Sequence, residues 1–230
     1  MIFPDTRSKL NDIHAVIFDL DGTMVDSVPD IHLALNLMKA DLSLPKIDVE
    51  LVRRFVGRGS ENLVRSTLST DLDTGDVQQI LPKAMTLFYR HYRTTNGYHS
   101  TIYPSVKEGL QRMRENGLRL ACVTNKPAIF TEPLLAQKGL YDFFHIIYSA
   151  DSFPRKKPDP FPMQMACLKF GTLPSQTLVI GDSINDAQAA RAAGCSLFIV
   201  PYGYNHGQSV EEIDSDGIVP DILTAAHLIM

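Results

Sequence analysis

The sequence predicts an α/β fold in which a parallel sheet carries helices on both faces and a small all-helical domain is inserted after the first strand. Two observations support this. Short, nearly continuous apolar runs alternate with helical patterns in the second half of the chain, as in βαβ units whose strands are buried on both faces. The first apolar run lies about 100 residues before the second, whereas one βαβ unit needs only about 30.

Five apolar runs are predicted to be strands, because each is short and bounded by turn residues. They lie at residues 15–18, 118–123, 145–148, 177–180 and 197–200. Helical patterns separate the later strands, at residues 130–138, 162–170 and 186–193. The last four strands start roughly 27, 32 and 20 residues apart, which is a normal spacing for successive βαβ units.

A segment of roughly 75 residues follows the first strand and contains no convincing strand. Its helical patterns lie at residues 30–38, 49–55, 60–68 and 76–92. We expect Pro82 to start or kink the last of these helices, because proline cannot donate a backbone hydrogen bond inside a helix. With tethers at 26–29 and 99–104, the predicted domains are a core of residues 1–25 and 99–230 and a helical insert of residues 26–98.

Composition and charge exclude several classes of protein. The chain has 44% hydrophobic and 21% charged residues, and its net charge is −4 with no basic run, so we expect neither a nucleic-acid nor a membrane partner. No apolar stretch approaches 18 residues, and residues 1–10 lack the apolar region of a secretory signal. Three widely spaced cysteines fit buried free thiols in a reducing compartment, so we expect a cytoplasmic protein.

The first polar cluster is Asp19-Leu20-Asp21-Gly22-Thr23, directly after the first strand. In an open parallel sheet, ligands bind beyond the carboxyl ends of the strands. Two carboxylates this close together need a cation or a shared proton, and Mg²⁺ prefers carboxylate oxygens as ligands. The alternative interpretation is a plain acidic turn, in which Gly22 adopts a conformation that other residues avoid.

Two more clusters follow later strands and offer groups that bind phosphate. Thr124-Asn125-Lys126 supplies a hydroxyl and backbone N–H groups for a phosphate oxygen, or else caps the next helix. A Pro-rich basic segment supplies Lys156 and Lys157, either of which could neutralise a phosphate or simply face solvent. We choose Lys157, because the proline that follows it restricts its backbone.

The fourth cluster, residues 181–186, follows the strand at 177–180 and contains two carboxylates. Asp182 stands at the strand end and Asp186 is four residues further on, so the two share one face if a helix begins near Ser183. An acidic loop in this position suits metal ligation better than packing. The order of acidic pair, hydroxyl, lysine and acidic pair on successive strand ends predicts metal-assisted phosphoryl transfer.

In these four clusters the sequence resembles the haloacid dehalogenase-like phosphatases over nearly its whole length. The first cluster matches the family's first motif, Thr124 the second, Lys157 the third and residues 181–186 the fourth. The resemblance implies a Rossmann-like core, and the insert stands where the family has a helical cap. Within the family, strings at 26–30, 56–59, 123–127 and 202–207 resemble phosphoglycolate phosphatases, the last string being the most discriminating.

The resemblance implies a Mg²⁺-dependent phosphomonoester hydrolase that works through an aspartyl-phosphate. Asp19 would be the nucleophile, and Asp21 would serve as general acid and then general base. Mg²⁺ would be held by Asp19, the backbone carbonyl of Asp21 and Asp182. Asp186 would orient the ligands and waters around the metal.

The resemblance also implies how a small phosphorylated organic acid would bind, with 2-phosphoglycolate as the expected substrate. Thr124, Asn125 and Lys157 would bind the phosphoryl group. Arg58 could pair with a substrate carboxylate, or its loop is only a turn between helices. His206 could approach the site, but we expect it to structure its loop.

Several alternatives remain open at this stage. The same chemistry could act on a sugar phosphate or a nucleotide, since only the insert and the 202–207 loop bear on the substrate. A phosphomutase would use the same intermediate but protect it from water. A dehalogenase is disfavoured because Asp21 would have no leaving alkoxide to protonate. A non-enzymatic phospho-acceptor domain is the remote alternative, since such domains carry their acidic residues without an inserted lid.

Overall fold

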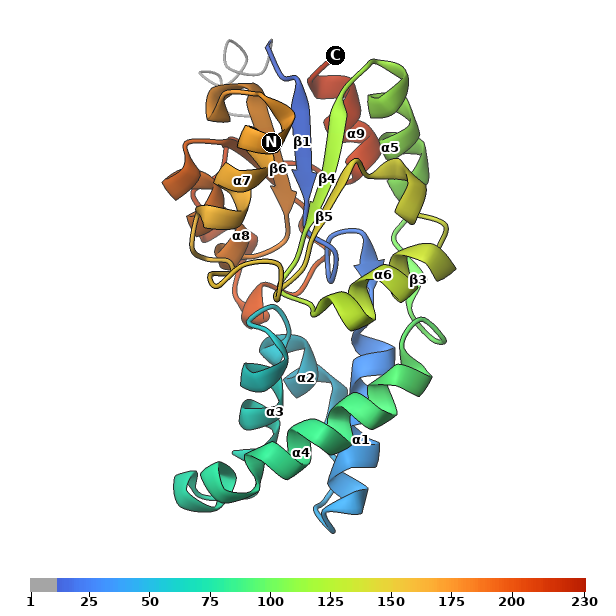
Figure 1. Cartoon of the computed structure of the whole chain (residues 1–230), viewed down its shortest axis with the longest axis vertical. Coiled ribbons are helices and arrows are strands. Elements are labelled where there is room, and N and C mark those ends of the chain that lie inside the picture. Colours follow the sequence, from blue (N-terminus) through green and yellow to red (C-terminus); the bar gives the residue numbers. More distant parts are fainter. Residues whose placement is uncertain (1–11) are drawn as a thin grey trace.

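The structure is a computed structural model that describes residues 12–230, so residues 1–11 of the predicted core, and with them the segment considered for a signal, lie outside it (Figure 1). Within this range, six strands form one parallel sheet in the order β5-β4-β1-β6-β7-β8. They are β1 (Ala15–Phe18), β4 (Arg119–Val123), β5 (Ile146–Tyr148), β6 (Thr177–Gly181), β7 (Ser196–Ile199) and β8 (Gly217–Ile218). The predicted parallel sheet is confirmed; the sequence analysis missed β8 because two residues form no apolar run.

Helices cover both faces of the sheet, as predicted (Figure 1). One face packs against α5 (Val106–Glu115), α6 (Ala128–Gln137) and α9 (Ile222–Leu228), and the other against α7 (Phe161–Phe170) and α8 (Ile184–Ala193). Successive residues of a strand point to opposite faces. In β1, Val16 and Phe18 accordingly belong to the hydrophobic core shared with α5, α6 and α9, and Ala15 and Ile17 to the core shared with α7 and α8. This two-sided burial is why the strand is apolar throughout.

The register of the central strands aligns their carboxyl ends. Phe18, the last residue of β1, pairs with Cys122 on one side and Ile180 on the other. The next residue, Asp19, donates its backbone N–H to the carbonyl of Ile180 at 3.0 Å. The polar clusters that follow β1, β4 and β6 therefore meet at one edge of the sheet.

The insert consists of α1 (Val28–Asp41), α2 (Val49–Phe55), α3 (Ser60–Leu68) and α4 (Thr74–Thr95), and it lies below the carboxyl edge of the sheet in Figure 1. Helix α4 begins at Thr74, where Asp73 accepts a hydrogen bond from the N–H of Asp76 at 2.9 Å. Pro82 lies inside this helix and does not start it, so of the two expected effects only the kink remains a prediction.

The two connections between core and insert pair with each other. Strand β2 (Val25–Asp26) lies antiparallel to β3 (Thr101–Ile102). The sequence analysis treated residues 26–29 and 99–104 as plain tethers, because strands of two residues leave no periodic pattern. The pairing brings the outgoing and returning chains together at one place beside the sheet edge.

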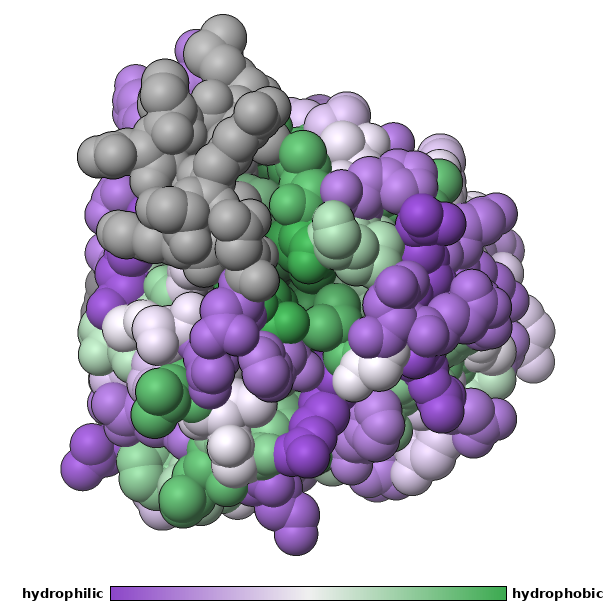
Figure 2. All heavy atoms as spheres, turned by 90° about the horizontal axis from the view of Figure 1, so that it is seen from above, coloured by the Kyte–Doolittle hydropathy of each residue, from purple (hydrophilic) through white to green (hydrophobic). Residues whose placement is uncertain are grey.

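The opposite end of the core is seen in Figure 2. Hydrophilic residues occupy much of this face, and a narrow hydrophobic strip runs near its centre.

Among residues 12–230, no helix combines the length and apolar character needed to cross a membrane. The three cysteines are buried and free, as expected.

Candidate active site

A buried lysine and two buried carboxylates form the centre of the site. Lys157 Nζ lies 2.7 Å from Asp19 Oδ1 and 2.8 Å from Asp186 Oδ1, and all three side chains are buried. Lys156 is exposed, so the structure places Lys157, rather than its neighbour, in this cluster. Loop chemistry alone left both lysines available, because only the fold decides which one faces inward.

Asp182 completes an acidic group with Asp19 and Asp186. Carboxylate oxygens of the three residues lie within 4.8 Å of one another. Asp182 is fixed by two hydrogen bonds, from Thr23 Oγ1 at 3.0 Å and from the backbone N–H of Tyr204 at 2.7 Å. These bonds hold the carboxylate toward the other two acids.

The electrostatics of this group call for a cation. Burial raises the pKa of Asp19 to about 7, with Asp186 adding to the rise and Lys157 opposing it. Burial, together with the charges of Asp186 and Asp19, also raises the pKa of Asp182. Three close carboxylates with one lysine bound between two of them leave uncompensated negative charge. Because the donors are all hard oxygen atoms, the residues fit Mg²⁺.

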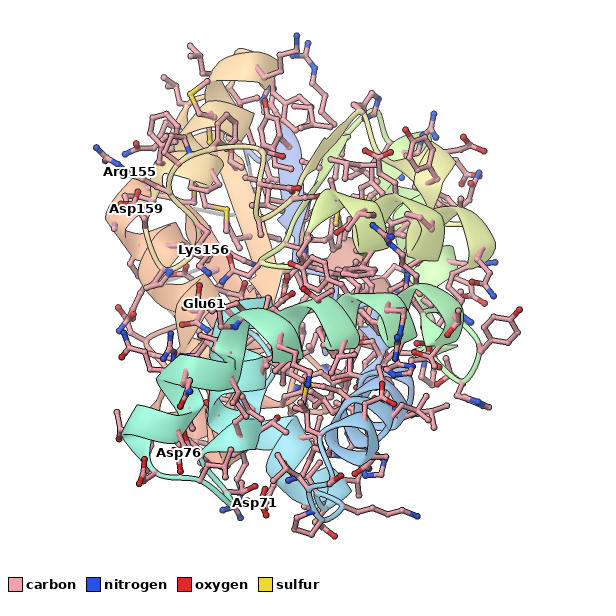
Figure 3. All side chains as sticks on the ribbon, turned by 60° about the horizontal axis from the view of Figure 1, so that its bottom comes forward. Glu61, Asp71, Asp76, Arg155, Lys156 and Asp159 are labelled. Carbon is pink, nitrogen blue, oxygen red and sulfur yellow. The ribbon has the colours of Figure 1, made fainter. Side chains whose placement is uncertain are left out.

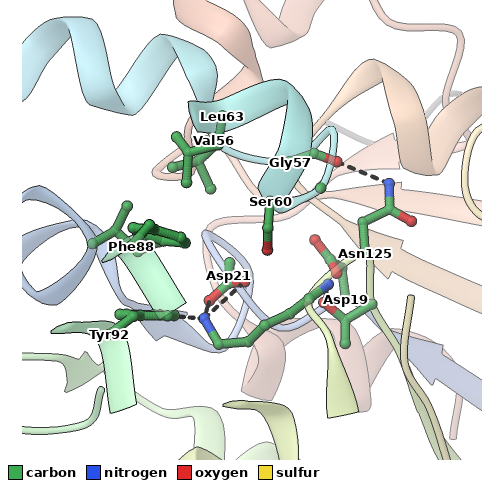
Figure 4. A pocket seen from close by; sticks show the side chains of 13 residues that line it. Asp19, Asp21, Val56, Gly57, Ser60, Leu63, Phe88, Tyr92 and Asn125 are labelled. Carbon is green, nitrogen blue, oxygen red and sulfur yellow. Dashed lines mark hydrogen bonds and ion pairs between the residues drawn. The ribbon is translucent and has the colours of Figure 1, made fainter. Parts of the chain in front are cut away.

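Asp21 lies beside this group and contacts a second buried lysine (Figure 4). Asp21 Oδ1 accepts a hydrogen bond from Ser27 Oγ at 2.5 Å. It accepts another from Lys126 Nζ at 3.0 Å. Lys126 Nζ also donates to the hydroxyl of Tyr92, on α4 of the insert, at 2.5 Å. In the sequence, Lys126 stands out only as part of Thr124-Asn125-Lys126. No local signal marks it as a site residue, because its contact with Tyr92 of the insert is a tertiary one.

Thr124 and Asn125 lie at the end of β4, opposite Asp19. Thr124 Oγ1 accepts a hydrogen bond from the backbone N–H of Lys126 at 3.1 Å. Asn125 Nδ2 donates to the carbonyls of Gly57 and Lys157, both at 2.9 Å, so this side chain joins the insert to the lysine loop (Figure 4). Asn125 Oδ1 is buried and has no hydrogen-bond partner within the described part of the chain.

A cavity of about 40 Å³ lies between the core and the insert (Figure 4). The core lines it with polar residues: Asp19, Asp21, Thr124, Asn125 and Lys126. The insert supplies most of the apolar wall: Ile31, Val56, Leu63, Phe88 and Tyr92, with Gly57, Gly59 and Ser60 beside them. Since one water needs roughly 10–15 Å³, the space holds only a few atoms.

Two predicted or considered residues lie outside this cavity. Arg58 is exposed and is not among the residues that line the cavity. His206 is half-buried, with Nδ1 3.1 Å from the carbonyl oxygen of Arg54 and Nε2 3.1 Å from Asn185 Nδ2. The bond to Arg54 attaches the 202–207 loop to the insert and the bond to Asn185 attaches it to α8 of the core, in keeping with the expected loop-structuring role.

The loop at residues 57–59 packs tightly against the core. Gly59 has φ of +90°, and a β-carbon there would lie 2.6 Å from Lys156 Nζ. Figure 3 shows Lys156 on its core loop beside the start of α3, where Glu61 lies. Glycine is therefore favoured at residue 59 for its conformation, whereas the end of the flexible, exposed Lys156 side chain could move away from a β-carbon.

Comparisons with known proteins agree with this geometry. A family model for haloacid dehalogenase-like hydrolases matches residues 13–194. A phosphoglycolate phosphatase from Nitrosospira multiformis is 48% identical over 217 residues, which cover 94% of this chain and 96% of the relative. Another from Thiobacillus denitrificans is 44% identical over 217 residues, with the same 94% and 96% coverage.

A crystal structure of a predicted phosphoglycolate phosphatase from Haemophilus somnus has a TM-score of 0.89 and 32% sequence identity. The similarity covers 95% of this chain and 99% of that one. The family model spans most of the chain, and the relatives match it nearly end to end. The chain therefore belongs to the haloacid dehalogenase-like hydrolases.

Proposed function

We propose that this chain is a Mg²⁺-dependent phosphomonoester hydrolase that cleaves 2-phosphoglycolate to glycolate and inorganic phosphate. The observation that carries the proposal is the contact of Asp19 with Lys157 at 2.7 Å, beside two further buried carboxylates and at the floor of a small cavity. The substrate is supported by relatives of that name, which match 94% of the chain at up to 48% identity.

The two carboxylates of the first motif divide the chemistry. Asp19 attacks the phosphorus and forms an aspartyl-phosphate as the bond to the glycolate oxygen breaks, which splits one difficult step into two. Asp21 protonates the departing alkoxide and later takes a proton from the water that hydrolyses the intermediate. When held by Asp19, the Asp21 carbonyl and Asp182, with Asp186 orienting its ligands, Mg²⁺ supplies positive charge that stabilises the transferring phosphoryl group.

Three groups at neighbouring strand ends bind the phosphoryl oxygens. The Thr124 hydroxyl and the Asn125 backbone N–H donate to them, and the Lys157 ammonium neutralises their charge. Lys157 also fixes Asp19, because its Nζ bridges Asp19 and Asp186 at 2.7 and 2.8 Å. The same lysine therefore orients the nucleophile and stabilises the group that the nucleophile attacks.

The insert excludes bulk water and limits the size of the leaving group. Gly57 contributes its carbonyl to hydrogen bonds from Asn125 at 2.9 Å and Asn185 at 3.3 Å, which hold the insert against the core. A closed site protects the aspartyl-phosphate until one water is admitted. The insert leaves little space over the carboxylates, which supports a small leaving group such as glycolate over a sugar or a nucleoside. Buried free cysteines support a reducing, cytoplasmic location.

The test is kcat/KM with Mg²⁺ for 2-phosphoglycolate, glucose 6-phosphate, glucose 1-phosphate and a nucleoside monophosphate. We expect 2-phosphoglycolate to exceed the others by at least about tenfold, and Asp19→Asn to lose about 10³-fold or more of phosphate release. A higher kcat/KM for any of the other esters would refute 2-phosphoglycolate as the preferred substrate. Isomerisation of glucose 1-phosphate without phosphate release would indicate a mutase. An active Asp19→Asn enzyme would refute the assignment of Asp19 as the nucleophile.

A further inference from the structure

Lys126 places a positive charge in the cavity that the phosphoryl chemistry does not use. Its side chain is buried, and its ammonium lies 3.0 and 3.3 Å from the two carboxylate oxygens of Asp21. A carboxylate in contact with a lysine favours the charged form of that lysine. The side chain is therefore a fixed cation.

A ligand that carries a carboxylate as well as a phosphoryl group requires a second positive charge in the cavity. Among the described residues that line it, Lys126 carries the one basic side chain. Lys157 serves the opposite side, where it contacts Asp19 and Asp186. The wall formed by the insert is largely apolar, and an unpaired carboxylate against such a surface is costly. Among the lining residues, Lys126 is the one that offers a carboxylate on the leaving group a positive charge.

The insert holds this ammonium in place through Tyr92. The hydroxyl of Tyr92 accepts a hydrogen bond from Lys126 Nζ at 2.5 Å, and Nζ lies 4.7 Å from the centre of the ring. The ring is fixed in turn, because it stacks on Phe88 at 5.3 Å and packs against Phe130 at 4.7 Å. Lys126 Nζ makes three hydrogen bonds, to Asp21 Oδ1 at 3.0 Å, to Asp21 Oδ2 at 3.3 Å and to the Tyr92 hydroxyl. The 3.3 Å bond is the longest, and Asp21 stays bound through its other oxygen if a ligand takes that donor.

We propose that Lys126 is the specificity-determining residue that binds the substrate's carboxylate, with Tyr92 as its positioning residue. The inference rests on the proposed function and deepens it by naming the group that distinguishes 2-phosphoglycolate from an uncharged ester. It assigns to Lys126 the role that sequence reasoning gave to Arg58, whose side chain is exposed and outside the cavity lining. Because Tyr92 belongs to the insert, the carboxylate site is complete only when the insert lies against the core.

The test compares two esters on the full-length enzyme with Mg²⁺. 2-Phosphoglycolate carries the carboxylate, and ethyl phosphate has a methyl group in its place. The measured quantity is the carboxylate preference, defined as kcat/KM for 2-phosphoglycolate divided by kcat/KM for ethyl phosphate. Because both values come from one preparation, the preference does not depend on the fraction of enzyme that is folded. If a variant also impairs the acid–base role of Asp21, kcat/KM falls for both esters and the preference is unchanged.

We expect Lys126→Met to lower the carboxylate preference by about 10- to 100-fold, as for a lost hydrogen bond to a charged group. Tyr92→Phe keeps the ring but removes one bond to the ammonium, so a smaller fall of about 3- to 10-fold is expected. Arg58→Met is the matched control, and it should leave the preference within about twofold. If Lys126→Met is inactive on both esters, the fall in Tyr92→Phe decides.

The failures are distinguishable. If the wild-type enzyme does not prefer the carboxylated ester, the proposed function is wrong and the inference falls with it. If the wild-type enzyme prefers 2-phosphoglycolate and the Lys126 and Tyr92 variants keep that preference, only the inference is overturned. A loss of preference confined to Arg58→Met would assign the carboxylate to Arg58 instead.

Discussion

Asp30 is the polar anchor of the junction between the core and the insert. It lies in the first turn of α1 and is fully buried. Its carboxylate accepts backbone hydrogen bonds from Gly97 at 2.8 Å, His99 at 2.7 Å and Ser100 at 3.0 Å, and another from the Ser100 hydroxyl. One side chain at the entry of the insert thus binds the segment by which the chain leaves it.

Replacing Asp30 by alanine removes the acceptor of three backbone N–H groups at once. Each buried donor left without a partner costs about 1–3 kcal/mol, and entry of water lowers the sum, so we expect a loss of roughly 3–5 kcal/mol in the free energy of unfolding. Asp30→Asn keeps one oxygen acceptor but turns an amide group toward at least one donor, for an expected loss of about 1–3 kcal/mol.

The assay is urea denaturation at neutral pH, followed by circular dichroism. Asp48→Ala is the matched control: Asp48 also accepts a backbone hydrogen bond, from Glu50 at 2.8 Å, but it is exposed and caps only α2. Its expected cost is about 1 kcal/mol. The reasoning is refuted if Asp30→Ala loses no more stability than Asp48→Ala, or if the asparagine variant is as unstable as the alanine variant.

Two further predictions concern the proposed metal ligand Asp182 and the ion pair between exposed Asp71 and buried Lys39. In Gly203→Ala the new β-carbon would lie 2.2 Å from the β-carbon of Asp182, so Mg²⁺ affinity measured by calorimetry should fall about 10- to 100-fold; Gly75→Ala, whose nearest neighbour is 3.4 Å away, should not change it. Burial acts to raise the pKa of Asp71, but its bonds to buried Lys39 and to a neighbouring threonine lower it overall. The stabilisation that follows from the lowered pKa of Asp71 is complete above the unfolded pKa of about 3.9 and is lost as the pH falls through the lower folded value. The stability gap between the wild type and Asp71→Asn should therefore shrink toward about pH 2, and a constant gap in urea titrations would contradict the assignment.

The sheet and most helices were predictable because burial on both faces leaves a local record. A parallel strand covered on both sides is apolar at nearly every position, as in β1 and at residues 178–180 of β6, and such runs are visible without any knowledge of the fold. The short strands β2, β3 and β8 leave no such record. Their pairing is set by the path of the chain around the sheet rather than by the two residues in each.

The part of the candidate site that could be predicted is the set of residues placed by the carboxyl ends of the strands. Asp19, Asp182 and Asp186 lie together because parallel strands bring their carboxyl ends to one edge. The choice of Lys157 over its neighbour agrees with the structure, although the decisive contact with Asp19 is a tertiary one. The position of Lys126 could not be predicted, because it depends on a hydroxyl from a helix of the insert, more than thirty residues earlier in the chain.

The central claim is that the Asp19 carboxylate is transiently esterified by the phosphoryl group it removes. Its most direct test is rapid acid quenching of the enzyme during turnover of 2-phosphoglycolate with Mg²⁺, followed by mass spectrometry of its peptides. We predict one phosphoryl group on the peptide that contains Asp19, and none in Asp19→Asn. A phosphoryl group on another residue, or phosphate release by Asp19→Asn at the wild-type rate, would contradict the claim.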